Sequence, residues 1–117
     1  MDYQPGLHII AEISSAKKNL LEQFAGVKQL LDSQVAKYQL SKLGEVYHNF
    51  EPGGFTAVIC LSESHISLHT WPEYERVNLD IYLSNYQRYN DDTGRQLFDE
   101  LVAFFEADII ACQQLKR

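Results

Sequence analysis

Residues 62–73 carry most of the groups in this chain that can do chemistry, in the order Ser-Glu-Ser-His-Ile-Ser-Leu-His-Thr-Trp-Pro-Glu. Glu63 is followed by a hydroxyl residue, Ser64, and by two imidazoles, His65 and His69. A serine hydroxyl can attack the carbonyl of the preceding residue to form an ester, which a base can eliminate across the serine Cα and Cβ. Hydrolysis then leaves a pyruvoyl group. The segment therefore predicts self-cleavage between Glu63 and Ser64.

The same segment allows two simpler interpretations. On a helix, the spacing of His65 and His69 would let both imidazoles bind one zinc ion. Ile66 and Leu68 alternate with polar residues, however, which favours a strand, and a strand separates the two histidines by about 13 Å. We therefore predict no metal site. The other alternative is a half-buried strand whose polar face carries two histidines, but the glutamate and serine before them favour chemistry.

Length and charge limit the classes of function. A chain of 117 residues forms one domain, without room for a separate cofactor domain. Ten Lys and Arg against sixteen Asp and Glu give a net charge of -6, and adjacent basic residues occur only at 17–18 and 116–117. A nucleic acid partner is therefore not expected.

The cysteines and the absence of sorting signals indicate a cytoplasmic protein. Cys60 and Cys112 lie in apolar stretches without Cys-x-x-Cys spacing, which favours a reduced compartment without disulfides. The first residues lack a basic-then-apolar signal, and no apolar run approaches the length of a membrane span. We expect neither export nor a membrane partner.

Periodicity predicts the elements that position these residues. Alternating apolar residues predict strands at 7–13, 46–50, 55–61, 65–69, 77–83 and 109–115. Spacings of three and four predict helices from Ser15 to about Tyr38, capped by Ser14 or Ser15, and over 97–105. A turn at 52–54 and a loop at 84–93 connect them.

This order of elements predicts a two-layer α/β sandwich in a single domain, residues 1–117, with a mainly antiparallel sheet and two helices on one face. Two helices cannot cover both faces of such a sheet. The second face must be polar or buried against another molecule, so we expect a homodimer formed through the open face or the sheet edges.

Residues 63–74 resemble the processing-site signature of the short prokaryotic S-adenosylmethionine decarboxylases. The likeness extends forward to Asp80 and backward through a set of residues in the first half of the chain, namely His48, Phe50, Pro52, Gly53, His8, Ala11 and Glu12. It is specific around Ser64 and weak in the helices. The resemblance implies cleavage into a β chain of residues 1–63 and an α chain of residues 64–117.

The resemblance also assigns roles to single residues. It implies that Ser64 becomes the pyruvoyl cofactor, that His69 assists the elimination and that Thr56 stabilises the processing intermediate. Phe50 matches an aromatic that stacks on the adenine of the substrate, and Glu73 matches an acidic residue of the substrate site. The family decarboxylates S-adenosylmethionine, a small molecule, to supply the aminopropyl donor for spermidine synthesis, and it has active sites at a dimer interface.

Two positions depart from the family pattern. Ser84 stands where the family has the cysteine that protonates the substrate after carbon dioxide leaves, and a hydroxyl is a much weaker acid than a thiol. Cys60 precedes Ser64 by four positions and is not an obvious replacement. Glu51 stands where the family has an apolar residue. We favour S-adenosylmethionine as the substrate, ahead of ornithine or arginine, and both ahead of a regulatory paralogue without catalysis.

Overall fold

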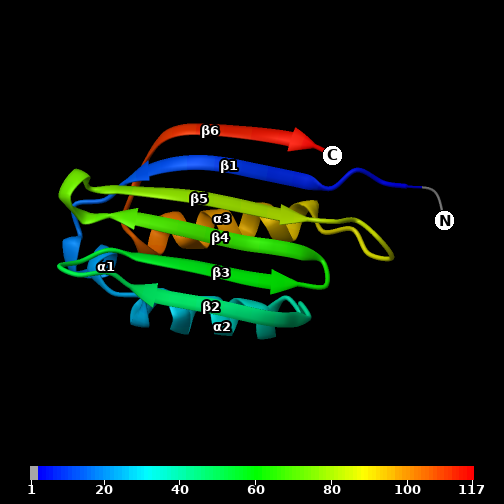
Figure 1. The fold of residues 1–117 in the computed structure, drawn as a ribbon. Coiled ribbons are helices and arrows are strands. Elements are labelled where there is room, and N and C mark those ends of the chain that lie inside the picture. Colours follow the sequence, from blue (N-terminus) through cyan, green and yellow to red (C-terminus); the bar gives the residue numbers. More distant parts are fainter. Residues whose placement is uncertain (1–2) are drawn as a thin grey trace.

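One antiparallel sheet of six strands forms the centre of the molecule. The structure, a computed structural model, describes residues 3–117. The strands are ordered β2-β3-β4-β5-β1-β6, and all neighbouring strands run antiparallel (Figure 1). They span β1 Leu7–Ser14, β2 Lys42–Asn49, β3 Phe55–Leu61, β4 Ser64–Trp71, β5 Arg76–Leu83 and β6 Asp108–Lys116.

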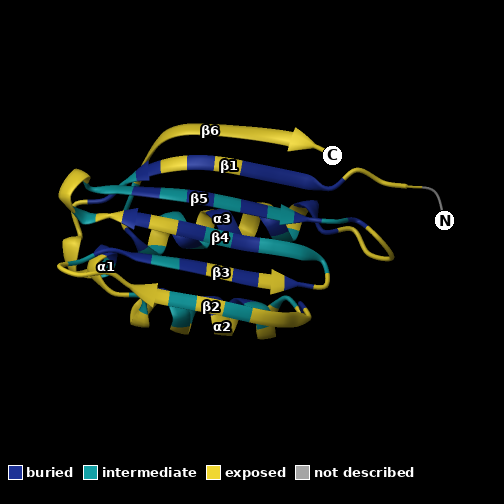
Figure 2. Ribbon diagram, viewed as in Figure 1, coloured by how far each residue is buried: buried dark blue, intermediate teal, exposed yellow. Residues whose placement is uncertain are grey.

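All helices cover the same face of this sheet (Figure 1). They are α1 (Lys18–Glu22), α2 (Ala25–Lys37) and α3 (Asp91–Phe104), and a short 3-10 turn, η1 (Pro72–Tyr74), joins β4 to β5. Buried positions lie along the central strands of the sheet (Figure 2). Apolar strand residues that face the helices form the core, and Ile66, Ile81 and Ile9 are fully buried cross-strand neighbours. The predicted fold class, a two-layer α/β sandwich with helices on one face, is confirmed.

The predicted helix from Ser15 to Tyr38 is wrong in its continuity. The chain is extended at Gln23, between α1 and α2. Two contacts from the β2–β3 hairpin hold this break: the Phe24 N–H donates to Asn49 Oδ1 at 2.9 Å, and the Gly54 N–H donates to the Glu22 carbonyl at 3.0 Å. These bonds satisfy backbone groups at the two helix ends. The break therefore fixes the hairpin tip against the helical layer.

Other predicted boundaries also change. Neither Ser14 nor Ser15 caps α1, whose N-cap residue is Lys17. Ser15 Oγ accepts from the Lys17 N–H at 3.1 Å, before the helix begins, and donates to the Phe105 carbonyl. The second helix begins at Asp91, not near Leu97, so part of the predicted loop is helical. The strands predicted at 46–50 and 65–69 are longer than expected and span Lys42–Asn49 and Ser64–Trp71.

Within residues 3–117, the opposite face of the sheet carries no helix and is lined by rows of cross-strand side chains. Cross-strand partners share a face. The rows that cross all six strands, read from β2 to β6, are Gly44-Cys60-His65-Tyr82-His8-Leu115, Val46-Val58-Ser67-Asp80-Ile10-Gln113 and His48-Thr56-His69-Asn78-Glu12-Ala111. A further row, Trp71-Arg76-Ser14-Asp108, crosses β4, β5, β1 and β6. We call this surface the open face. No helix among residues 3–117 is long and apolar enough to cross a membrane.

Candidate active site

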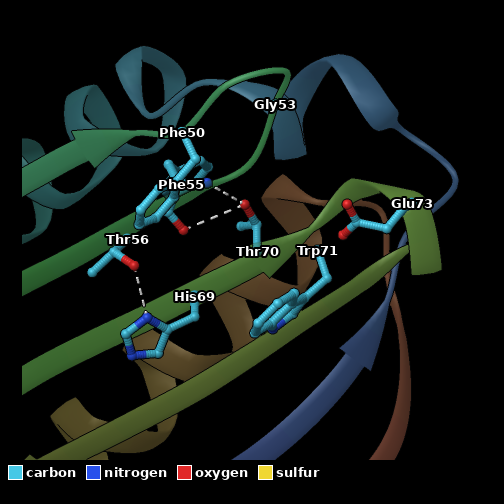
Figure 3. Close-up of a pocket in the computed structure, with 8 residues that line it drawn as sticks. All are labelled: Phe50, Gly53, Phe55, Thr56, His69, Thr70, Trp71 and Glu73. Atoms are coloured by element: carbon cyan, nitrogen blue, oxygen red, sulfur yellow. Dashed lines mark hydrogen bonds between the residues drawn. The ribbon is translucent and has the colours of Figure 1, made fainter.

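A pocket of about 290 Å³ opens beside the tip of the β2–β3 hairpin (Figure 3). Its lining includes four residues singled out from the sequence and four neighbours, and consists of Phe50, Gly53, Phe55, Thr56, His69, Thr70, Trp71 and Glu73. The four singled-out residues come from the hairpin, β3, β4 and η1. The fold thus collects predicted processing and substrate groups in one hollow.

His69 is oriented by Thr56 across the β3–β4 pair. The two residues are direct cross-strand partners on the open face, and Thr56 Oγ1 lies 2.9 Å from His69 Nδ1 (Figure 3). This hydrogen bond occupies one ring nitrogen and leaves Nε2 for proton transfer. A base held in this way is suited to remove a proton from carbon, because its ring cannot rotate freely.

The walls of the pocket are fixed by contacts with the helical layer and the open face. Thr70 Oγ1 accepts from the Phe55 N–H at 2.8 Å and donates to the Leu21 carbonyl at 2.6 Å. Trp71 Nε1 donates to Asn78 Oδ1 at 2.7 Å. Phe50 is half-exposed at the rim, where a flat ligand can stack on it.

Gly54 is needed where the hairpin tip approaches Thr70, one of the pocket residues. Its φ is +100°, and an added Cβ would lie 3.1 Å from the Thr70 carbonyl oxygen. A larger residue would have to move this tip, which also carries Phe50.

Ser64 and Glu63 lie far from this pocket in the same chain. Ser64 begins β4 and His69 follows five positions later, so strand geometry separates their Cα atoms by about 16 Å. The structure therefore does not bring the predicted nucleophile and the predicted base together within one chain.

The backbone at the predicted cleavage point is strained and polarised. Ser64 has a φ of +146°, a region that non-glycine residues rarely adopt and that costs about 1–3 kcal/mol. The carbonyl of Glu63, which Ser64 would attack, accepts a hydrogen bond of 2.7 Å from the Ser84 N–H. A donor at this oxygen stabilises the negative charge that develops during attack. The contribution of Ser84 at this point is therefore its backbone N–H, which does not depend on the side-chain hydroxyl.

Sequence reasoning missed a cluster of ionisable residues on the open face near Ser64. Asp80 Oδ1 lies 2.6 Å from His8 Nε2 and 3.1 Å from His65 Nε2. The three ligand atoms fall within 4.8 Å of one another, close enough to share a metal ion. The Arg117 guanidinium, 3.2 Å from His8 Nδ1, opposes a cation there by its charge. The alternation of β1 and β5 placed His8 and Asp80 on polar faces, but only the strand order makes them neighbours.

The cysteines also differ from their apolar sequence context. Cys60 and Cys112 are both exposed and unpaired. Cys60 lies on the open face directly opposite His65, because the β3–β4 hairpin folds it back beside the start of β4. Cys60 therefore lies closer to Ser64 than their separation of four positions in the sequence suggested.

Comparison with known proteins agrees with this geometry. The family model described as S-adenosylmethionine decarboxylase matches residues 7–117. The chain belongs to this family. A S-adenosylmethionine decarboxylase proenzyme from Archaeoglobus fulgidus is 46% identical over 77 residues, which cover 66% of this chain and 69% of that protein. One from Thermoplasma acidophilum is 35% identical over 101 residues, or 86% of this chain and 77% of that one.

Another relative in the S-adenosylmethionine decarboxylase family matches over a shorter part of its length. The proenzyme from Hydrogenobaculum sp. is 39% identical over 66% of this chain, and the match spans 58% of that protein. The crystal structure of the adenosylmethionine decarboxylase from Aquifex aeolicus superposes with a TM-score of 0.80 at 25% identity, covering 99% of this chain and 91% of that one. The family suggested by the residues around Ser64 is thereby confirmed.

Proposed function

We propose that this chain cleaves itself between Glu63 and Ser64 and uses the resulting pyruvoyl group to decarboxylate S-adenosylmethionine. The observation that carries the proposal is the convergence of Phe50, Thr56, His69 and Glu73 on one pocket, in a chain of this family. A strained Ser64 and a polarised Glu63 carbonyl add support at the cleavage point itself.

Cleavage follows from the groups around the bond. Ser64 Oγ attacks the Glu63 carbonyl carbon, the C–N bond breaks as the C–O bond forms, and the Ser64 nitrogen gains the proton. The Ser84 N–H stabilises the oxygen charge during this step. His69 Nε2 then takes the Ser64 Cα proton, the Cβ–O bond breaks and Glu63 leaves as a carboxylate. The resulting dehydroalanine gains a proton at Cβ and becomes an imine. Water then hydrolyses the imine, which releases ammonia and leaves a ketone at the start of the 64–117 chain.

We assign the base to a second copy of the chain. His69 lies about 16 Å along the strand from Ser64 of its own chain. Two open faces packed about a twofold axis with their β4 strands antiparallel would bring the Ser64 end of each β4 beside the pocket end of the partner's β4. His69 of each chain then faces Ser64 of the other, and the same contact occurs twice. Apolar side chains that are exposed on this face support the packing, and they include Ile10, Val46, Val58, Trp71 and Leu115. We therefore infer a homodimer with two shared sites.

The pocket has groups suited to S-adenosylmethionine. A pyruvoyl carbonyl condenses with a primary amine and withdraws electrons as carbon dioxide leaves. Phe50 offers a stacking surface for adenine, and the Glu73 carboxylate attracts the sulfonium charge. Ser84 supplies the proton or holds a water that does so. The product would serve as aminopropyl donor for spermidine, and two unpaired thiols fit a reaction in the cytoplasm.

A second candidate substrate is a basic amino acid. Ser84 in place of the family's cysteine and Glu51 beside Phe50 both alter the neighbourhood of the substrate. Glu51 is exposed next to the pocket rim, where its charge would favour the cationic side chain of ornithine or arginine. A regulatory paralogue, either cleaved or uncleaved, would show no turnover of any amine.

The deciding experiment is carbon dioxide release from processed protein, with each amine offered separately. We expect release from S-adenosylmethionine. Release from ornithine or arginine alone would reject S-adenosylmethionine as the substrate. No release from any amine, with the pyruvoyl group confirmed by a carbonyl reagent, would favour the regulatory paralogue.

A further inference from the structure

The loop between β5 and α3, residues 84–90, packs against the peptide bond that the proposed function would break. Two of its residues contact Glu63. The Ser84 N–H donates to the Glu63 carbonyl at 2.7 Å, and Arg88 Nη2 lies 3.6 Å from Glu63 Oε2. The other side-chain oxygen of Glu63 accepts from the Ser41 N–H at 3.1 Å. Glu63 is therefore held at its carbonyl and at both carboxylate oxygens.

Elimination changes the charge at this point. Before it, Glu63 carries one negative charge on its side chain. When the ester breaks, the carbonyl becomes a second carboxylate on the same residue, so two negative charges lie close together. Two negative charges on one residue repel each other, and this repulsion opposes elimination unless a cation compensates it. Stabilisation of a leaving group as its charge develops is a recognised catalytic effect.

Arg88 is placed to provide that compensation. Its two contacts in the structure, to Glu63 Oε2 and to the Gln39 carbonyl at 3.3 Å, both involve Nη2. A guanidinium has five N–H donors, so others are available for a second carboxylate. Glu63 is the more buried partner, because 17% of its side chain is exposed against 40% for Arg88. Salt and water therefore screen the charge of the Glu63 carboxylate less than that of a fully exposed group.

The Ser84 donor is itself held by buried amides. Asn90, which is 1% exposed, donates from Nδ2 to the Ser84 carbonyl at 2.9 Å. The Asn90 N–H donates to Asn85 Oδ1 at 2.6 Å, and Asn85 Nδ2 donates to Asp91 Oδ1 at 2.9 Å. This network fixes the loop at both ends, so that Ser84 and Arg88 face Glu63 together.

We propose that the 84–90 loop is the leaving-group site of self-cleavage, in which Arg88 binds the Glu63 carboxylate released by elimination. This inference rests on the proposed function. It assigns Arg88 to the second step, elimination, and not to ester formation. The Cβ–O bond breaks with its electron pair going to the Glu63 carboxylate, and the Cα proton goes to the base.

The test follows cleavage over time in chains made by cell-free translation, comparing Arg88→Gln, Arg88→Lys and wild type. Arg95→Gln is the matched control, because Arg95 pairs with Asp92 on the exposed surface of α3. Alkaline hydroxylamine splits the ester at Glu63, so it measures chains that have completed the first step only. We expect Arg88→Gln to slow release of the 64–117 chain about tenfold and to accumulate the ester, since one charged donor is lost. Arg88→Lys should keep most of the rate, and Arg95→Gln all of it.

Three results would overturn the inference. They are cleavage of Arg88→Gln at the rate of Arg95→Gln, slow cleavage without ester, and a lysine variant as slow as the glutamine variant. Ester formation requires the folded geometry, so an accumulated ester also excludes misfolding as the cause. Failure of the wild-type chain to cleave would instead reject the proposed function.

Discussion

The side chain and the backbone N–H of Ser84 have different roles, and only the side chain could be assessed from the sequence. Its side chain marks the departure from the family's cysteine. Its backbone N–H binds the Glu63 carbonyl, a contact between the end of β5 and the residue before β4. No pattern of residue types predicts that contact, because any residue other than proline could make it. Substitution of the Ser84 side chain should therefore affect turnover more than cleavage.

We predict that Ser84→Cys raises carbon dioxide release from S-adenosylmethionine by about tenfold, because a thiol with a pKa near 8.5 is a far better acid than a hydroxyl. Self-cleavage should continue, since the backbone donor remains. Ser84→Ala is the matched control and should lower release below wild type. Equal turnover in all three proteins would mean that the residue at position 84 neither donates the proton nor holds the water.

The other residues of the site also fall into two groups, those that the sequence predicted and those that only the structure showed. Phe50, Thr56 and Glu73 were chosen from the family likeness alone, and His69 from its residue type as well. The fold brings all four to one pocket. The cluster of His8, His65 and Asp80 was missed because its members lie on three strands. Neighbours of that kind depend on strand order, which periodicity does not report.

At the scale of elements, local patterns gave the types of segments but not all of their limits. The spacing of apolar residues runs through Gln23 without interruption, so one helix was predicted. The break depends on Asn49 and Gly54, which are distant in sequence. The start of α3 was missed because its first turn is polar, with Asp91 and Asp92. Tertiary hydrogen bonds decided both boundaries.

Asp91 links the start of α3 to β6 and to the loop that holds Ser84. Burial acts to raise the pKa of its carboxyl, but hydrogen bonds from Lys116 and Asn85 hold the pKa below its usual value. A carboxyl whose folded pKa is lowered stabilises the fold above its unfolded pKa, and this contribution is lost as pH falls through the folded pKa.

We predict that Asp91→Asn lowers the free energy of unfolding at pH 7 by about 1–3 kcal/mol, the range for a buried charged hydrogen bond. The difference between variant and wild type should shrink as pH falls below about 4, where the carboxyl of the unfolded chain gains its proton, and on through the lower pKa of the folded carboxyl. Urea unfolding across this pH range measures both quantities. A difference that stays constant with pH would contradict an ionised Asp91 in the folded state.

At the scale of the whole molecule, the one-sided helical layer was predictable from two amphipathic segments in a short chain. The position of β1 between β5 and β6 was not, yet it places His8 on the open face beside Asp80. The separation of Ser64 from His69 follows from strand geometry once both are assigned to β4. That separation makes a second chain part of the proposed site.

Complementation between two inactive variants tests the shared site. Ser64→Ala lacks the nucleophile and His69→Ala lacks the base, so each alone should cleave slowly or not at all. When the two are co-expressed, one site of the mixed dimer combines an intact Ser64 with an intact His69. The His69→Ala chain should then be cleaved and the Ser64→Ala chain should not. Absence of cleavage in a dimer shown by sedimentation to form would place the base within the same chain.

The central claim is that Ser64 becomes a pyruvoyl group, and the mass of the denatured protein tests it most directly. Wild-type protein should give two chains, residues 1–63 with a free carboxyl end and residues 64–117 with a blocked, carbonyl-reactive beginning. Ser64→Ala should remain a single chain of about 13.5 kDa with an unchanged fold. A wild-type protein that stays one 117-residue chain after long incubation would contradict the account.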